Sequence, residues 1–309
     1  MNKKTQTIIA FVIGLIFIGI LTFVLTHNKQ KPIVQKNKLQ IVASFYPLYF
    51  LSEQIAGDKA DVVNITPAGA EPHDYEPTAQ DIAQIENSKL LVLDGTGLEA
   101  WGNNIKQNLN PKNTTVLIVG DGIIDQKVME DGQDVIDPHI WLSPPLVKQI
   151  TDKITQALIQ IDPANSNYYQ TNANSLKAKL DNLDVEYKQG LSNCAEKNII
   201  TSHAAFGYLA TTYGLNQVSI AGLSPDAEPS PQQLADITKF AKANNVKFIF
   251  FESLVSPKLS DTIANEIGAK TLVLNPIEGL TNDEISQGKN YFTEMQNNLS
   301  NLKTALQCK

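Results

Sequence analysis

The sequence predicts an α/β protein with two parallel-sheet lobes joined by one long helix. Its 309 residues exceed what a single hydrophobic core usually organises, so two lobes are expected. Two series of short, β-branched runs alternate with helical patterns, which is typical of parallel sheets. Between the two series, residues 143–191 carry helical patterns only.

Each series supplies strand-like runs. The first comprises residues 41–45, 62–66, 90–94 and 116–119, and the second comprises residues 199–201, 218–221, 246–251 and 271–274. Helix starts are expected where a capping residue precedes an acidic residue or proline in the first turn, at Thr78 with Asp81, Ser230 with Pro231, and Ser256 with Pro257. Gly268 is expected to end the last of these helices.

Two helical patterns fill the middle of the chain. The first starts at Ser143, which precedes proline, and repeats apolar residues to Ile161. A second pattern extends from Pro163 to Gly190, and we expect this helix to join the lobes. The chain therefore divides into an N-terminal lobe at residues 39–162, a connecting helix at residues 163–192 and a C-terminal lobe at residues 193–309.

The N-terminal residues 1–27 have the pattern of a transmembrane anchor or a signal. Lys3 and Lys4 precede an apolar stretch at residues 8–25, which as a helix would span ~27 Å of hydrocarbon. The stretch is longer than a usual signal core and no A-x-A cleavage site is evident, which favours an uncleaved anchor. No cysteine follows that could carry a lipid, and residues 28–38 are a polar linker. The rest is expected to be extracytoplasmic, on the periplasmic or cell-surface face.

Composition excludes some classes of partner. Hydrophobic residues make up 42% of the chain and charged residues 18%, which is enough apolar material for packed cores. A net charge of -7 provides no basic surface for nucleic acid and is a common solubility device. We expect a monomer without a nucleic-acid partner.

The chain has two cysteines, Cys194 and Cys308. An even count in an exported protein favours a disulfide, which in the chain-entropy model would contribute about 4 to 5 kcal/mol for so long a loop. Two unrelated thiols are the alternative.

Three of the four histidines lie at turns after strand-like runs: His73 in Glu-Pro-His-Asp, His139 in Asp-Pro-His-Ile, and His203 in Thr-Ser-His-Ala. In open α/β sheets, ligands gather at the carboxyl ends of strands, so these side chains are expected to converge in one crevice. Each alone is an ordinary loop histidine, but their conjunction favours a metal site. Imidazole nitrogens suit zinc, copper, nickel or iron, and zinc is the best match.

A tetrahedral zinc ion needs a fourth donor. The turn after the last strand-like run supplies Glu278, whose alternative interpretation is a solvated loop carboxylate. Glu252, which follows the run at residues 246–251, is its rival. Glu278 is preferred, largely because of a resemblance to a known family.

Five motifs carry that resemblance: ASFYP at residues 43–47, PHDYEPT at 72–78, DPHIWL at 137–142, TSHAAFGY at 201–208 and LNPIEGL at 274–280. In this order they resemble the metal-specific solute-binding proteins of bacterial ABC importers (cluster A-I), in their ZnuA-like zinc branch. The resemblance extends over residues 39–308. It implies two α/β lobes joined by a backbone helix, Zn²⁺ bound between them, and delivery to an ABC importer membrane permease.

The resemblance also assigns residues. His73, His139 and His203 match the three histidine positions of the family, and Glu278 takes the fourth position. The manganese branch typically has glutamate third and aspartate fourth, so His203 favours zinc. Cys194 is paired with Cys308 by the same resemblance.

The chain departs from the family before its second histidine. Many zinc-branch members carry a histidine-rich loop there, whereas residues 120–136 contain Asp125, Glu130, Asp131 and Asp134 but no histidine. We expect a charged surface loop rather than a metal-collecting one.

The sequence thus predicts a high-affinity zinc-binding protein that captures Zn²⁺ and delivers it to an ABC-type permease. A manganese- or iron-binding homologue and a metal-dependent adhesin with the same fold are the alternatives. A zinc hydrolase is not favoured, because a fourth protein ligand would close the coordination shell and the sequence has no H-E-x-x-H motif. No enzymatic activity is expected.

Overall fold

Two four-stranded parallel sheets organise the computed structural model, which describes residue 2 and residues 38–309 except 96 and 131. The first sheet has the strand order β2-β1-β3-β4 and the second the order β10-β9-β7-β8. Their bounds are β1 Leu39–Ala43, β2 Ala60–Asn64, β3 Leu90–Leu93 and β4 Thr115–Ile118, then β7 Asn198–Thr201, β8 Asn216–Ser219, β9 Phe248–Phe251 and β10 Lys270–Val273. All pairings within both sheets are parallel, which confirms the predicted fold class.

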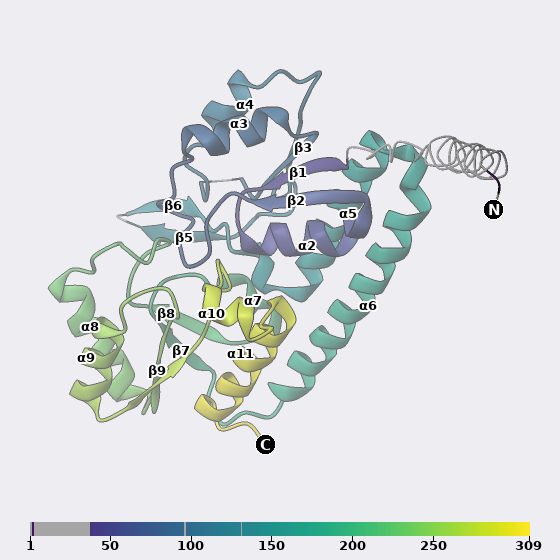
Figure 1. The fold of residues 1–309 in the computed structure, drawn as a ribbon. Helices are drawn as coiled ribbons and strands as arrows, with labels where there is room; N and C mark the ends of the chain where they lie inside the picture. Colours follow the sequence, from purple (N-terminus) through teal and green to yellow (C-terminus); the bar gives the residue numbers. More distant parts are fainter. Residues whose placement is uncertain (1, 3–37, 96, 131) are drawn as a thin grey trace. The chain divides into compact units, whose positions relative to one another are not determined.

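Helices flank both sheets. Those of the first lobe are α2 Tyr46–Ala56, α3 Ala79–Asn87, α4 Gly102–Asn108 and α5 Pro144–Ile161. Those of the second lobe are α7 Gly207–Tyr213, α8 Pro231–Ala243, α9 Lys258–Ile267, α10 Asn282–Ser286 and α11 Tyr291–Ala305. The long helix α6, Ser166–Gly190, runs past both sheets along one side (Figure 1) and packs against α2, α5 and α11. It therefore joins the lobes, as predicted.

The capping signals are realised in part. Thr78 and Ser230 both form capping boxes, with Asp81 and Gln233 as their partners. The third start is displaced, because α9 has Pro257 rather than Ser256 at its N-cap position. Gly268 ends α9 in the left-handed conformation with φ of 70°, where glycine carries no Cβ penalty.

The expected surface loop at residues 120–136 contains a β-hairpin instead. Its strands β5, Lys127–Glu130, and β6, Gln133–Ile136, pair antiparallel, and the intervening Gly132 has φ of 77°. Val128 and Val135 pair on one face of the hairpin, so apolar pairing stabilises it despite the surrounding charge. Asp131 lies outside the described residues.

One hydrophobic cluster extends across both lobes. Phe50 of α2 stacks on Tyr291 of α11 with ring centroids 5.9 Å apart, and Phe45 contacts Trp141 edge-on. Cys194 and Cys308 form a disulfide with a sequence separation of 114, so the chain just after α6 is linked to the end of the C-terminal segment. The predicted disulfide is confirmed.

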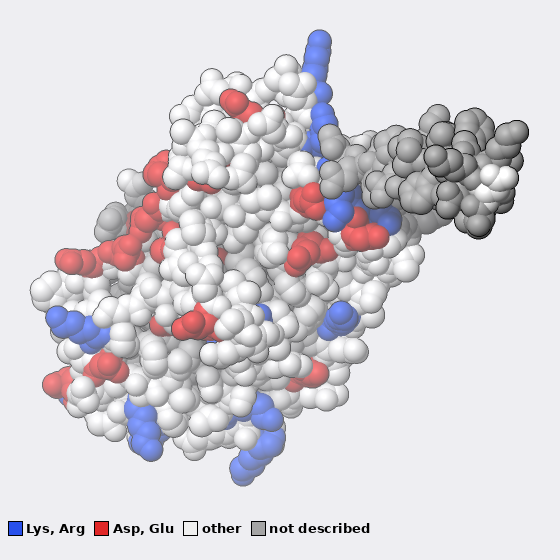
Figure 2. Space-filling model, in the orientation of Figure 1, with Lys and Arg blue, Asp and Glu red and all other residues white. Residues whose placement is uncertain are grey.

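The predicted anchor at residues 1–27 lies outside the described residues except for residue 2, as does the linker except for Lys38. Within the part of the chain that the structure describes, no helix is long and apolar enough to cross a membrane. Residues Leu39–Lys309 form one compact unit. Acidic and basic side chains are interspersed on the face of it that Figure 2 shows.

Candidate metal centre

His139 is fully buried just after β6. Its ring Nδ1 lies 2.7 Å from Asp137 Oδ1, and its backbone N–H donates to the same oxygen at 2.9 Å. A carboxylate at Nδ1 favours the tautomer with the proton on Nδ1, because only that nitrogen can then donate. The lone pair of Nε2 is thereby left for a ligand.

His203, in the turn after β7, is held in the same way. Its Nδ1 lies 2.6 Å from Glu252 Oε1, and its backbone N–H donates to that oxygen at 3.2 Å. Glu252 follows β9, which is the neighbour of β7 in the sheet. The rival fourth donor thus lies behind His203 and orients its ring.

Glu278 follows β10 in a turn with unusual backbone geometry. The preceding residue, Ile277, is fully buried and has φ of 59°, a left-handed conformation that is costly for a β-branched side chain. The Ile277 N–H donates to Asn275 Oδ1 at 2.7 Å, and Asn275 is itself held by two hydrogen bonds to Asn298 of α11. This buried amide network offsets the strain and directs the Glu278 carboxylate inward.

His73 lies in the loop between β2 and α3 and retains 8% side-chain exposure. Its backbone N–H donates to Glu71 Oε1 at 3.1 Å. The same loop is tied to the Glu278 turn of the other lobe, because Gly69 N–H donates to the Leu280 carbonyl at 3.0 Å.

The structure brings all four predicted residues together. One ligand atom from each of His73, His139, His203 and Glu278 lies within 4.8 Å of the others. Glu278 Oε1 is 3.3 Å from Nε2 of both His139 and His203 and 3.5 Å from Nε2 of His73. The Nε2 atoms of His139 and His203 are 3.3 Å apart.

The four separations of 3.3 to 3.5 Å between these donor atoms fit a zinc ion. In a tetrahedron with metal–ligand bonds of about 2.0 to 2.1 Å, neighbouring donors are about 3.3 to 3.4 Å apart. Neither Glu278 oxygen, nor Nε2 of His73, has a hydrogen-bond partner among the described residues, although these atoms are buried. A buried carboxylate without donors is costly, and a cation at this point would satisfy it.

The charged groups shift one another's pKa values. Burial alone would lower the pKa of His203, but the carboxylates of Glu252 and Glu278 outweigh it and hold this pKa well above its ordinary value. His139 behaves similarly, since Asp137 and Glu278 raise its pKa against the effect of burial. Burial would raise the pKa of Glu278, yet His203 and the other imidazoles bring it well below its ordinary value. A metal-free site therefore tends to hold protons that a cation must displace.

Glu71 adds a further carboxyl beside the centre. Burial, followed by the charge of Glu278, raises the pKa of Glu71 to about 9. This side chain is therefore mostly neutral at pH 7 and adds little negative charge to the site.

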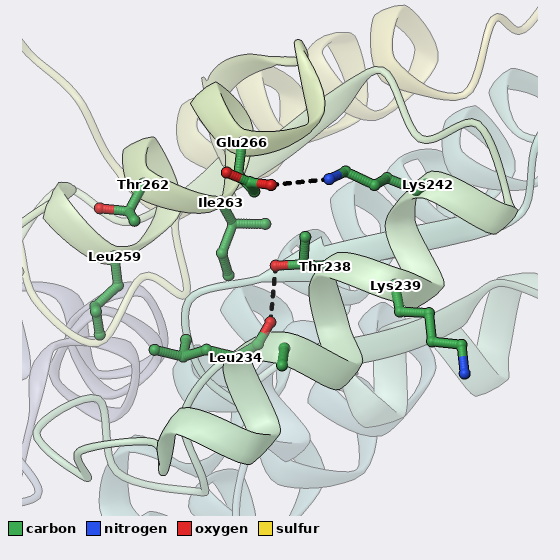
Figure 3. Close-up of a pocket in the computed structure, with 9 residues that line it drawn as sticks. Leu234, Thr238, Lys239, Lys242, Leu259, Thr262, Ile263 and Glu266 are labelled. Carbon is green, nitrogen blue, oxygen red and sulfur yellow. Dashed lines mark hydrogen bonds and ion pairs between the residues drawn. The ribbon is translucent and has the colours of Figure 1, made fainter.

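A separate groove lies between α8 and α9 (Figure 3). Leu234, Leu259 and Ile263 line it, and an ion pair of 2.9 Å between Lys242 and Glu266 crosses it. Its lining contains none of the four residues of the candidate centre.

Residues 41–305 match a protein family described as ZnuA, zinc-uptake complex component A periplasmic. The chain is 41% identical over 281 residues to the high-affinity zinc uptake system protein ZnuA of Bacillus subtilis, covering 87% of this chain and 88% of that protein. The chain belongs to the ZnuA family.

Two further proteins, AdcA and Lmb, are similar to the chain. The zinc-binding lipoprotein AdcA of Streptococcus pneumoniae is 40% identical, but the chain spans only 55% of its length. The solved Zn(II)-bound ZnuA-like domain of AdcA superposes with a TM-score of 0.76, covering 87% of this chain and 99% of the domain. The laminin-binding protein Lmb of Streptococcus agalactiae, described as a bifunctional protein with adhesin and metal transporting activity, is 35% identical to the chain. It superposes with a TM-score of 0.78, covering 87% of this chain and 99% of Lmb. The predicted membership of a zinc-uptake family is confirmed.

The roles of Asp137 and Glu252 as partners of the histidine rings were not predicted from the sequence. The signal for Asp137 is its place two residues before His139, which lets one oxygen reach both the backbone N–H and the ring. No local signal marks Glu252, because its position beside His203 depends on the strand order of the second sheet.

Proposed function

We propose that this member of the ZnuA family captures Zn²⁺ outside the cytoplasm and delivers it to the membrane permease of an ABC importer. His73, His139, His203 and Glu278 are the proposed ligands. The observation that carries the proposal is the convergence of three imidazole nitrogens on a buried carboxylate at the spacing of tetrahedral donors.

The donor set favours zinc over manganese as the cargo. Manganese and magnesium prefer oxygen donors, whereas three imidazoles suit zinc and its neighbours in the transition series. Glu252 and Asp137 support this choice, because a carboxylate at Nδ1 raises the basicity of the coordinating Nε2. The names of the ZnuA and AdcA relatives point to the same ion.

Capture rather than catalysis follows from the closed donor set. Four protein ligands leave no coordination position for a substrate, which a catalytic zinc requires. The family is a component of a transport complex. Because His139, His203 and Glu278 are 0 to 1% exposed, delivery to a permease requires the ligand loops to separate.

The proposal includes a location and an organisation for the chain. Residues 1–27 are proposed to hold a monomeric protein at the outer side of the membrane. Residues 39–162 and 193–309 form the lobes, and residues 163–192 connect them. The match to a periplasmic family component supports an extracytoplasmic site of action.

Competitive metal titration of the full chain tests the proposal. Zinc should bind with a stoichiometry of one ion per chain and should displace manganese when both are present. Tighter binding of manganese, or the absence of a saturable zinc site, would contradict it.

Adhesion is a second candidate function, favoured by the likeness to Lmb. Saturable binding of the zinc-loaded chain to immobilised laminin would support it. A signal no higher than that on an albumin-coated surface would rule it out.

A further inference from the structure

The β5–β6 hairpin makes a direct contact with the second lobe. Glu130, the last residue of β5, accepts a hydrogen bond of 3.1 Å from the backbone N–H of Leu223. Its carboxylate packs so closely on the neighbouring Gly222 that a Cβ built there would overlap Glu130 Oε1. Leu223 is buried, so packing holds the backbone that donates this hydrogen bond.

The segment that Glu130 contacts is hydrogen-bonded to the turn that carries His203. Gly222 carbonyl accepts a hydrogen bond from Ala204 N–H at 2.8 Å, and Ala221 N–H donates to the Ser202 carbonyl at 2.7 Å. The segment that Glu130 contacts therefore brackets His203 on both sides.

The other end of the hairpin leads directly into the His139 turn. Residue Asp137, which orients His139, follows β6 and donates its N–H to the Gln126 carbonyl at 3.1 Å. Tyr208 of α7 accepts hydrogen bonds from the N–H groups of Asp125 and Gln126, both at 3.0 Å. The base of the hairpin is thus anchored on the second lobe, and Glu130 provides a second attachment nearer its turn.

The two faces of the hairpin differ. Glu130 shares the inner, half-buried face with Val128, whereas the opposite face exposes Lys127, Met129 and Asp134. The ion pair of 3.7 Å between Lys127 and Asp134 lies on this outer face. Exposed pairs of this kind contribute little to stability, so Asp134 offers a matched control on the same hairpin.

We propose that Glu130 is a positioning residue that slows zinc release. It holds the β5–β6 hairpin, which leads into the His139 turn, against residues 221–223, which support His203. This inference rests on the proposed zinc-binding function. Breaking the contact between Glu130 and residues 222–223 allows the His139 and His203 turns to separate while leaving all four ligands in place. The dissociation rate should therefore rise, whereas the association rate should change little.

Stopped-flow release of zinc from the full chain into excess chelator measures the effect. We expect Glu130→Ala to speed release about tenfold, since a hydrogen bond to a charged acceptor is lost. Glu130→Gln, which keeps an acceptor oxygen without the charge, should speed release less. Gly222→Ala should resemble Glu130→Ala, because its methyl group displaces the carboxylate. Asp134→Ala should release zinc at the wild-type rate.

Thermal unfolding of the metal-free variants separates positioning from a general loss of structure. We expect the metal-free melting temperature of Glu130→Ala to stay close to that of Asp134→Ala. Unchanged zinc release in both Glu130→Ala and Gly222→Ala would overturn the role proposed for Glu130 while leaving zinc binding intact. Faster release from Glu130→Ala, accompanied by a corresponding fall in its metal-free melting temperature, would also overturn that role. A wild-type chain that binds no zinc would overturn the proposed function itself.

Discussion

The indole Nε1 of Trp141 donates a hydrogen bond of 2.7 Å to the carbonyl oxygen of Pro276. Trp141 lies two residues after His139, and Pro276 lies two residues before Glu278. The two turns that supply these proposed ligands are therefore joined directly, and Tyr291 reinforces the joint by donating its hydroxyl to the Trp141 carbonyl at 2.7 Å. Such preorganisation lowers the entropic cost of binding the ion.

Replacing Trp141 with phenylalanine tests how much this hydrogen bond contributes to stability and to zinc affinity. The change removes the indole N–H and leaves the Pro276 carbonyl without that donor, so we expect a loss of about 1 to 3 kcal/mol in unfolding free energy. Zinc affinity should fall as well, because the ligand turns lose their fixed spacing. Denaturant unfolding and zinc titration measure both effects. Equal effects from Trp101→Phe would show that the loss is only one of aromatic packing.

Removing the proposed ligands should have graded consequences. Any of His73→Ala, His139→Ala and His203→Ala should weaken zinc binding by about a hundredfold or more, since each deletes a nitrogen donor. Glu278→Ala should cost less, because water can take the vacated position. Competition titrations against a chelator of known affinity measure the series. Glu76→Ala, which removes an exposed carboxylate three residues after His73 in the same loop, serves as the control.

Glu252→Gln tests the orienting role of the carboxylate behind His203. An amide supports the Nδ1 proton less well, so zinc affinity should drop by about 10- to 100-fold. The fold should be retained, because the two side chains have the same shape. If Glu252→Gln lost more zinc affinity than Glu278→Ala, the roles assigned to the two glutamates would have to be exchanged.

Zinc should stabilise the chain more at pH 8 than at pH 6. The pKa of His203 is raised in the folded metal-free chain, so its protonation stabilises that state fully below the unfolded value of about 6.5. This contribution is lost as pH rises through the folded pKa. Zinc requires neutral imidazoles and gains affinity over the same range.

The lowered pKa of Glu278 acts at the other end of the scale. Its stabilising contribution is present above the unfolded value of about 4.3 and is lost as pH falls through the folded pKa. Glu278 therefore stays ionised between pH 6 and pH 8. Melting temperatures with and without zinc at both pH values measure the difference, and an increment that is the same or smaller at pH 8 would argue against an imidazole site.

Several features of the centre were predictable from local sequence. A protein with few histidines places three of them at turns after strands, and the structure brings these turns together. Strand positions were less exact: β1 begins at Leu39, whereas the apolar run begins at Ile41. Hydropathy marks which residues are buried, but backbone pairing continues into half-exposed positions such as Leu39.

Other features depend on contacts that local patterns do not encode. Glu278 was preferred over Glu252 largely through the family resemblance, since both follow strands of the second sheet. What separates them is the strand order, which sets Glu252 against Nδ1 of His203. The hairpin, by contrast, had a local signal, because its turn contains Asp131-Gly132, a dipeptide typical of tight hairpin turns.

Anomalous diffraction at the zinc absorption edge, from crystals of the zinc-loaded chain, tests the central claim most directly. We expect one strong peak enclosed by Nε2 of the three histidines and a carboxylate oxygen of Glu278, at about 2.0 to 2.2 Å from each. A peak at any other place, with these four side chains left uncoordinated, would contradict the account.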